Sequence, residues 1–207
     1  MKLNPNELSE NGYQLHDELD HQELVPFIQL YMKKRTAISS IYFAANMLLI
    51  VFVGYLFITG FKEPDFNIVE RFGQVSIGFL LAFLLLPLHE YIHVLAYKSQ
   101  GATHTSYDMN LKKFYFMALA DRFVANRKEF IIVALAPFLT ISVILIFLAM
   151  MLHHDTTLLI IAILLAHTAM CSGDFGLLSY FEFHKEKEIV TYDDVEKKVS
   201  YFYEKIE

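Results

Sequence analysis

Cysteine is nearly absent from this sequence, since Cys171 is the only one in 207 residues. A single cysteine excludes an intrachain disulfide and any zinc site built from several cysteines. Cys171 lies in an apolar segment, which predicts a small buried residue. The chain also lacks an excess of positive charge, because its formal net charge is −6. No basic stripe offsets this balance, so we expect no nucleic-acid partner.

Charge is missing from long stretches of the chain, which is 55% hydrophobic and only 19% charged. Residues 1–31 are polar and acidic without an apolar core, so we expect no cleaved signal peptide. Each of the later apolar segments is long enough for a bilayer core of roughly 30 Å. The predicted fold class is therefore an all-α membrane protein with four transmembrane helices. They are expected at 38–61, 74–97, 130–152 and 158–181.

The connections predict the domain organisation and the orientation. Basic residues precede the first span at 33–35, and six Lys or Arg residues lie between the second and third spans. The positive-inside rule then places both termini and the loop 98–129 in the cytoplasm of a multi-pass protein of the cell membrane. We expect a cytoplasmic segment 1–37, a membrane domain 38–182 with its core at 74–182, and a cytoplasmic tail 183–207.

Two polar regions carry a structural prediction of their own. Residues 103–119 are rich in Thr, Tyr and Phe and partly alternate in polarity, which predicts a short β-hairpin in the loop 98–129. Residues 193–206 alternate acidic side chains with lysines, which predicts a short solvated amphipathic helix.

The second apolar segment carries the motif His89-Glu90-x-x-His93. On a helix, histidines four residues apart lie one turn apart on the same face, where both can bind one zinc ion. Glu90 beside them has the position of a base for a water that the metal activates. Ionisable side chains in an apolar span are costly, so they mark a functional site unless hydrogen bonds inside a bundle satisfy them.

A catalytic zinc site takes a third protein ligand. Asp174 is the only acidic residue within the fourth segment, and it lies at about the same depth as the two histidines if the helices are regular. His167 lies seven residues earlier, on the same face but roughly 10 Å deeper. His167 is therefore an alternative ligand, a side chain that positions substrate or stabilises an oxyanion, or a hydrogen-bonded core histidine. Asp174 could instead orient a histidine from outside the ligand set.

These motifs resemble the site-2-protease class of intramembrane zinc metalloproteases. The resemblance covers residues 74–182 and rests on His89-Glu90-x-x-His93 and on an aspartate beside a glycine two spans later. More closely, the chain is similar to small bacterial membrane proteins grouped as zincin peptidases, through Ala136-Pro137 and Ser172-Gly173-Asp174. The resemblance implies a three-helix metalloprotease core, one Zn2+ per chain and a bacterial cell membrane. Neither Asn-x-x-Pro-x-x-x-Leu-Asp-Gly nor a PDZ domain is found in the sequence.

The leading hypothesis is a zinc-dependent intramembrane endopeptidase, with Glu90 catalytic and His89, His93 and Asp174 on the metal. Its partners would be the lipid bilayer and membrane-protein or peptide substrates, while the sequence sets no oligomeric state. A non-catalytic regulator or scaffold with a structural or vestigial metal site is the alternative. A transporter that uses the polar cluster as an ion site is disfavoured, since the four spans contain no inverted repeat.

Overall fold

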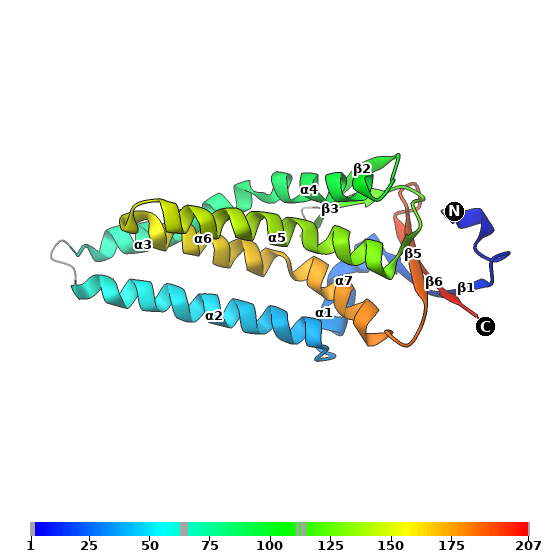
Figure 1. The fold of residues 1–207 in the computed structure, drawn as a ribbon, viewed down its shortest axis with the longest axis horizontal. Coiled ribbons are helices and arrows are strands. Elements are labelled where there is room, and N and C mark those ends of the chain that lie inside the picture. The colour runs from blue at the N-terminus through cyan, green and yellow to red at the C-terminus, as the bar shows by residue number, and fades with distance from the viewer. Residues whose placement is uncertain (1–2, 63–65, 111, 113–114, 207) are drawn as a thin grey trace. The chain divides into compact units, whose positions relative to one another are not determined.

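A computed structural model describes residues 3–62, 66–110, 112 and 115–206 (Figure 1). The chain divides into two compact units. The sheet unit consists of Met1–Ser39, Glu90–Pro137 and Gly173–Glu207. The helical unit consists of Ser40–His89 and Phe138–Ser172.

Helices dominate the described residues, but strands are also present. The helices are α1 (Leu24–Met32), α2 (Ala37–Thr59), α3 (Ile68–Leu84), α4 (Leu86–Ser99), α5 (Arg127–Met151), α6 (Thr157–Met170) and α7 (Ser172–Phe183). The strands are β1 (Tyr13–Asp20), β2 (Thr105–Asn110), β3 (Tyr115–Ala120), β4 (Ala125–Asn126), β5 (Ile189–Asp194) and β6 (Val199–Lys205). The prediction of an all-α protein is therefore wrong, because two antiparallel sheets accompany the helices.

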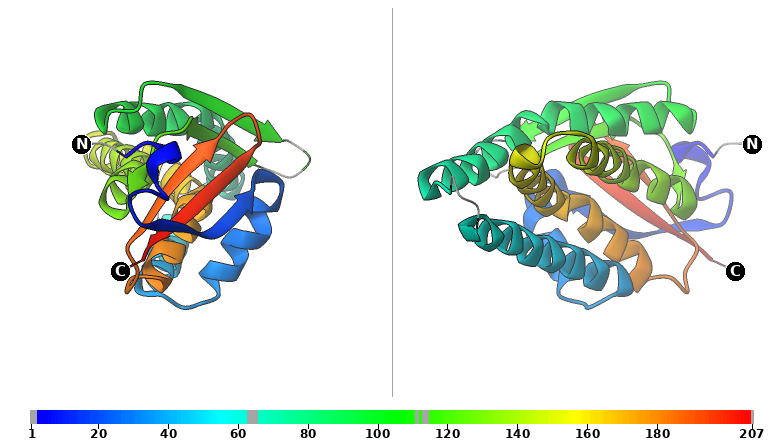
Figure 2. Two further views of the ribbon diagram at one scale, coloured as in Figure 1. Left: turned by 90° about the vertical axis from the view of Figure 1, so that its right-hand side faces the viewer. Right: turned by 60° about the vertical axis from the view of Figure 1, so that its left-hand side comes forward.

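The larger sheet has the strand order β1-β6-β5-β4, with neighbouring strands antiparallel (Figure 2). The tail forms β5 and β6 in place of the helix predicted over 193–206. Val190, Thr191 and Tyr192 favour a strand, as do Tyr201, Phe202 and Tyr203. Lys198 turns the chain between the two strands with a φ of 57°, in the left-handed region.

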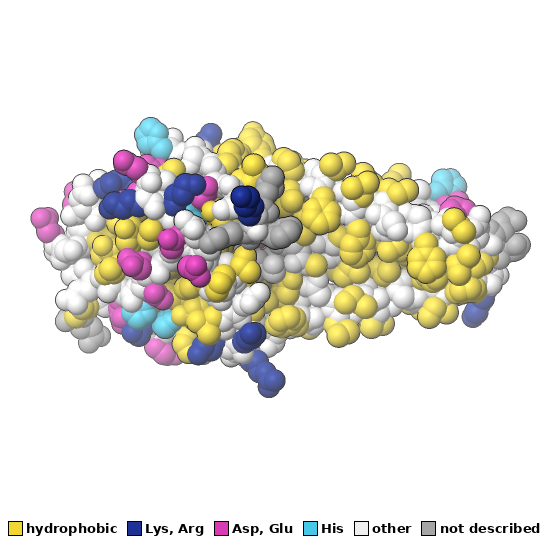
Figure 3. Space-filling view, turned by 180° about the vertical axis from the view of Figure 1, so that it is seen from behind, with side chains coloured by type: hydrophobic (Ala, Val, Ile, Leu, Met, Phe, Trp, Pro, Cys, Tyr) yellow, Lys and Arg dark blue, Asp and Glu magenta, His cyan; other side chains and the backbone are white. Residues whose placement is uncertain are grey.

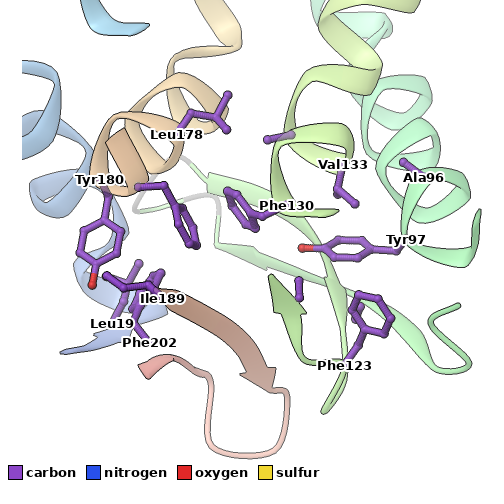
Figure 4. Close-up of a cluster of buried hydrophobic side chains, with 14 of the residues drawn as sticks. Leu19, Ala96, Tyr97, Phe123, Phe130, Val133, Leu178, Tyr180, Ile189 and Phe202 are labelled. Carbon is purple, nitrogen blue, oxygen red and sulfur yellow. The ribbon is translucent and has the colours of Figure 1, made fainter. Parts of the chain in front are cut away.

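One aromatic cluster forms the core of the sheet unit (Figure 4). Phe202 from β6 lies against Tyr180 from α7, with ring centroids 4.4 Å apart. The ring centroid of Phe130 from α5 lies 4.8 Å from that of Phe181. Tyr97 at the end of α4 belongs to the same cluster. The hydrophobic side of the sheet therefore holds the helices that carry the motif residues of this unit.

The predicted hairpin is confirmed. Strands β2 and β3 pair antiparallel, from Thr105 opposite Ala120 to Asn110 opposite Tyr115. Asp108 on β2 fastens the hairpin to the rest of the sheet unit, because it lies 3.2 Å from Nδ1 of buried His21 and accepts a 2.8 Å hydrogen bond from Lys198.

In the helical unit, α3 packs closely against α6. Gly78 permits this contact, since a Cβ atom on it would lie 2.7 Å from the Cβ of Ala162. In the most apolar 18-residue stretch of Ala37–Lys62, which contains α2, only 6% is buried. Figure 3 shows hydrophobic side chains over the helical unit, whereas charged side chains gather on the sheet unit. An apolar surface of this kind is typical of a site that contacts another protein or a membrane.

Two described helices, α2 and α5, are long and apolar enough to cross a membrane. Two bent pairs, α3 with α4 and α6 with α7, raise this number to four if each pair is one span. The first and third predicted spans thus correspond to single helices. The second and fourth predicted spans each correspond to two helices that meet at a bend.

Candidate metal centre

The motif lies on helix α4, and its three polar side chains are all buried, with 5% to 7% of their surface exposed. One ligand atom from each of His89, Glu90 and His93 lies within 4.8 Å of the others. The boundary between the two units falls between His89 and Glu90. The three side chains are brought together by one regular turn of the same helix, α4. Two imidazoles on one turn form the start of a zinc site.

Pro87 explains why α4 begins just before the motif. Helix α3 ends at Leu84 and α4 starts at Leu86, so Pro87 lies in the first turn of the new helix. A proline has no N–H to donate and would clash inside a longer helix, but it is tolerated in a first turn. The two helices are thus separated at Leu85, two residues before Pro87.

A second proline fixes the ring of His93. Pro137 lies inside α5 and has no N–H for the carbonyl of Val133, four residues earlier. Nδ1 of His93 lies 3.0 Å from this carbonyl oxygen. Since a carbonyl can only accept, Nδ1 carries a hydrogen, which makes Nε2 the nitrogen that could bind a metal. His93 thus makes the hydrogen bond that Pro137 cannot make.

Asp174 lies beside that same nitrogen. Its Oδ1 is 3.1 Å from Nε2 of His93, and both residues belong to the sheet unit. Asp174 lies in the first turn of α7, where the helix dipole favours a carboxylate. Oxygen and nitrogen ligands of one tetrahedral zinc ion lie about 3.3 Å apart, given bonds of about 2.0 to 2.2 Å. The pair formed by His93 and Asp174 therefore fits zinc in its chemistry and its spacing.

The carboxylate of Glu90 is held by the hairpin. Its Oε2 accepts a 2.7 Å hydrogen bond from the backbone N–H of Ala118 on β3. A neutral backbone donor therefore orients this buried carboxyl group and brings no opposite charge to it. Sequence reasoning missed both backbone partners, Ala118 and Val133, because neither has a polar side chain to signal it.

His167 lies beside His89 within the helical unit. Its Nε2 is 3.2 Å from Nδ1 of His89, and its side chain is fully buried. Cys171 follows one helical turn later, with its Sγ 3.9 Å from the same Nε2. The sequence interpretation treated Cys171 as a plain buried residue. The four-residue spacing from His167, the same as in the motif, could have drawn attention to it.

Comparison with known proteins identifies a family that matches this chain. Residues 82–188, just over half of the chain, match the family described as "Putative zincin peptidase". The chain belongs to this family. The match contains the motif, Pro137 and Asp174, and membership indicates a zinc peptidase. No curated protein and no solved structure matches the chain.

Proposed function

We propose that this zincin peptidase is a zinc-dependent intramembrane endopeptidase. It would hydrolyse peptide bonds of membrane-embedded or juxtamembrane substrates. The observation that carries the proposal is the contact of Asp174 with Nε2 of His93, which adds a carboxylate to the two imidazoles of a buried motif. A family membership that indicates a zinc peptidase supports the same conclusion.

His89, His93 and Asp174 would hold one Zn2+ per chain. When bound, zinc supplies the electrophilic chemistry, activation of a water and polarisation of the scissile carbonyl. Glu90 then takes the proton of the attacking water on a carboxylate oxygen and gives it to the leaving amine. The hydrogen bond from the N–H of Ala118 already orients the carboxylate of Glu90 before substrate arrives, so little reorientation is needed for proton transfer.

The membrane part of the proposal rests on the apolar segments. We propose a multi-pass protein of a bacterial cell membrane in which each bent helix pair serves as one span, with both termini in the cytoplasm. The basic residues at 33–35 and in the loop 98–129 support this orientation. A substrate would have to be locally unwound, since a helix hides its carbonyls from attack.

The experiment compares the metal content and the peptidase activity of the full chain, purified in detergent, for wild type, Glu90→Gln and His93→Ala. We expect about one zinc per chain in wild type and Glu90→Gln but none in His93→Ala, because His93 is a proposed zinc ligand and Glu90 is not. With β-casein as an unfolded probe, only wild type should cleave. Loss of the general base should lower the rate by about 10²- to 10⁴-fold.

Glu70→Gln is the matched control, since it makes the same chemical change on an exposed residue of α3. It should keep both zinc and activity. Equal cleavage by Glu90→Gln and wild type would refute the assigned base. Absence of zinc from every variant, even after zinc is supplied, would favour the regulator or scaffold with a vestigial site.

A further inference from the structure

Three metal-binding side chains meet within the helical unit, apart from His93 and Asp174. They are His89 at the start of α4, His167 near the end of α6 and Cys171 at the break between α6 and α7. One ligand atom from each lies within 4.8 Å of the others, and all three residues are buried. The thiol of Cys171 thus lies beside two imidazoles, which together make a set of three possible metal ligands.

The separations are those of ligands around one ion. Bonds of about 2.0 to 2.1 Å to nitrogen and about 2.3 Å to sulfur place two nitrogen ligands about 3.3 Å apart and a nitrogen and a sulfur about 3.6 Å apart. Here Nδ1 of His89 lies 3.2 Å from Nε2 of His167, and Sγ of Cys171 lies 3.9 Å from that Nε2. Little movement would close these atoms around a cation.

We propose that His89, His167 and Cys171 form a second metal site, which binds a soft d10 cation such as Cd2+ or Cu+. A thiolate with two imidazoles selects soft and borderline ions, whereas a carboxylate with two imidazoles suits zinc. On binding, the sulfur–metal bond replaces the S–H bond of Cys171, and the proton leaves to solvent. No electron transfer is involved.

The two sites share His89 and therefore exclude each other. A neutral imidazole has one lone pair, so it can bind a metal through Nδ1 or through Nε2 but not through both. Nδ1 of His89 faces His167, which leaves Nε2 for the catalytic zinc. A soft cation in the second site would withdraw His89 and inhibit the peptidase. This competition rests on the proposed function, whereas the binding itself does not.

The test titrates Cd2+ into the detergent-purified full chain and follows the ultraviolet charge-transfer band between thiolate and cadmium. Because Cys171 is the only cysteine, the band reports on this site alone. Wild type should saturate at one Cd2+ per chain. Cys171→Ser should lose the band, and His167→Gln should weaken the affinity by at least about 10-fold, the lower bound even for a partner outside the ligand set.

His93→Ala separates this proposal from the proposed function. It removes a ligand of the catalytic set and leaves the second set intact, so the cadmium band should persist while zinc is lost. Circular dichroism and gel filtration check that each variant is folded. If Cys171→Ser does not fold, Cys171→Ala takes its place. A band with unchanged affinity in His167→Gln would show a cysteine acting alone and overturn the site, as would no band in wild type.

If Cd2+ inhibits wild type through the second site, Cys171→Ser should cleave casein at the wild-type rate and resist that inhibition. Equal inhibition of both would refute the competition.

Discussion

Replacing Pro137 by alanine should weaken zinc binding while it strengthens the fold. The substitution gives residue 137 an N–H that can donate to the carbonyl of Val133, the acceptor that His93 uses at 3.0 Å. A proline inside a helix costs about 3 kcal/mol relative to alanine. Against this gain stands at most the loss of one hydrogen bond from His93, about 1 kcal/mol. The metal-free protein should therefore become more stable.

Zinc affinity should change in the opposite direction. Loss of a hydrogen-bonding partner of a histidine ligand typically costs 10- to 100-fold in metal affinity, or about 1.4 to 2.8 kcal/mol. A carbonyl has two lone pairs, so His93 can share it with the new N–H. We therefore expect the lower end, about 10-fold.

The assay is competition for zinc with a chelator of known affinity, together with thermal unfolding of the metal-free protein. Pro26→Ala is the control, because Pro26 lies in the first turn of α1, where the missing N–H has no partner to lose. Unchanged zinc affinity in a Pro137→Ala variant with raised unfolding temperature would refute the link between Pro137 and His93.

Three further predictions concern the remaining contacts. Asp174→Ala should lower zinc affinity by at least about 10-fold in the same competition assay, and an unchanged affinity would assign the third ligand elsewhere. Burial alone would raise the pKa of the Asp108 carboxyl, but hydrogen bonds from Lys198 and His21 together hold this pKa below its ordinary value of 3.8. The ionised carboxylate therefore stabilises the fold above the unfolded pKa and loses this contribution as pH falls through the folded pKa, so denaturant unfolding of Asp108→Asn should depend less on pH below about 5 than wild type. Gly176→Ala should destabilise the protein by about 1 to 3 kcal/mol, because its Cβ would lie 2.6 Å from Cγ2 of Ile28, while Gly173→Ala meets Ile28 only at 3.8 Å and should not.

The long apolar helices and the motif could be predicted from the sequence because both depend on local patterns. Uninterrupted apolar runs predicted α2 and α5, and the four-residue spacing placed His89 and His93 on one turn. The proximity of Asp174 to His93 followed from depth alone, since helix rise converts residue numbers into distance. The breaks at Leu85 and Cys171 could not be seen in the same way, because composition does not distinguish a bent span from a straight one.

The larger sheet was missed because its pairing is not local. The lysines and acids of residues 193–206 were interpreted as a helix surface, although Tyr201 and Tyr203 alternate with Ser200 and Phe202 as in a strand. Strand β1 pairs with β6, from Tyr13 opposite Lys205 to Asp20 opposite Val199, far along the chain. Neither strand alone identifies its partner, so the alternation of side chains can predict each strand but not the sheet that the strands form.

The pairing of β1 with β6 also bears on biosynthesis. Strand β1 emerges from the ribosome early and gains its neighbour only after residues 199–205 have been made. All the helices are therefore made while the sheet unit still lacks its last strand. Since His93 and Asp174 both belong to that unit, we expect their contact to become stable only once translation has delivered β6.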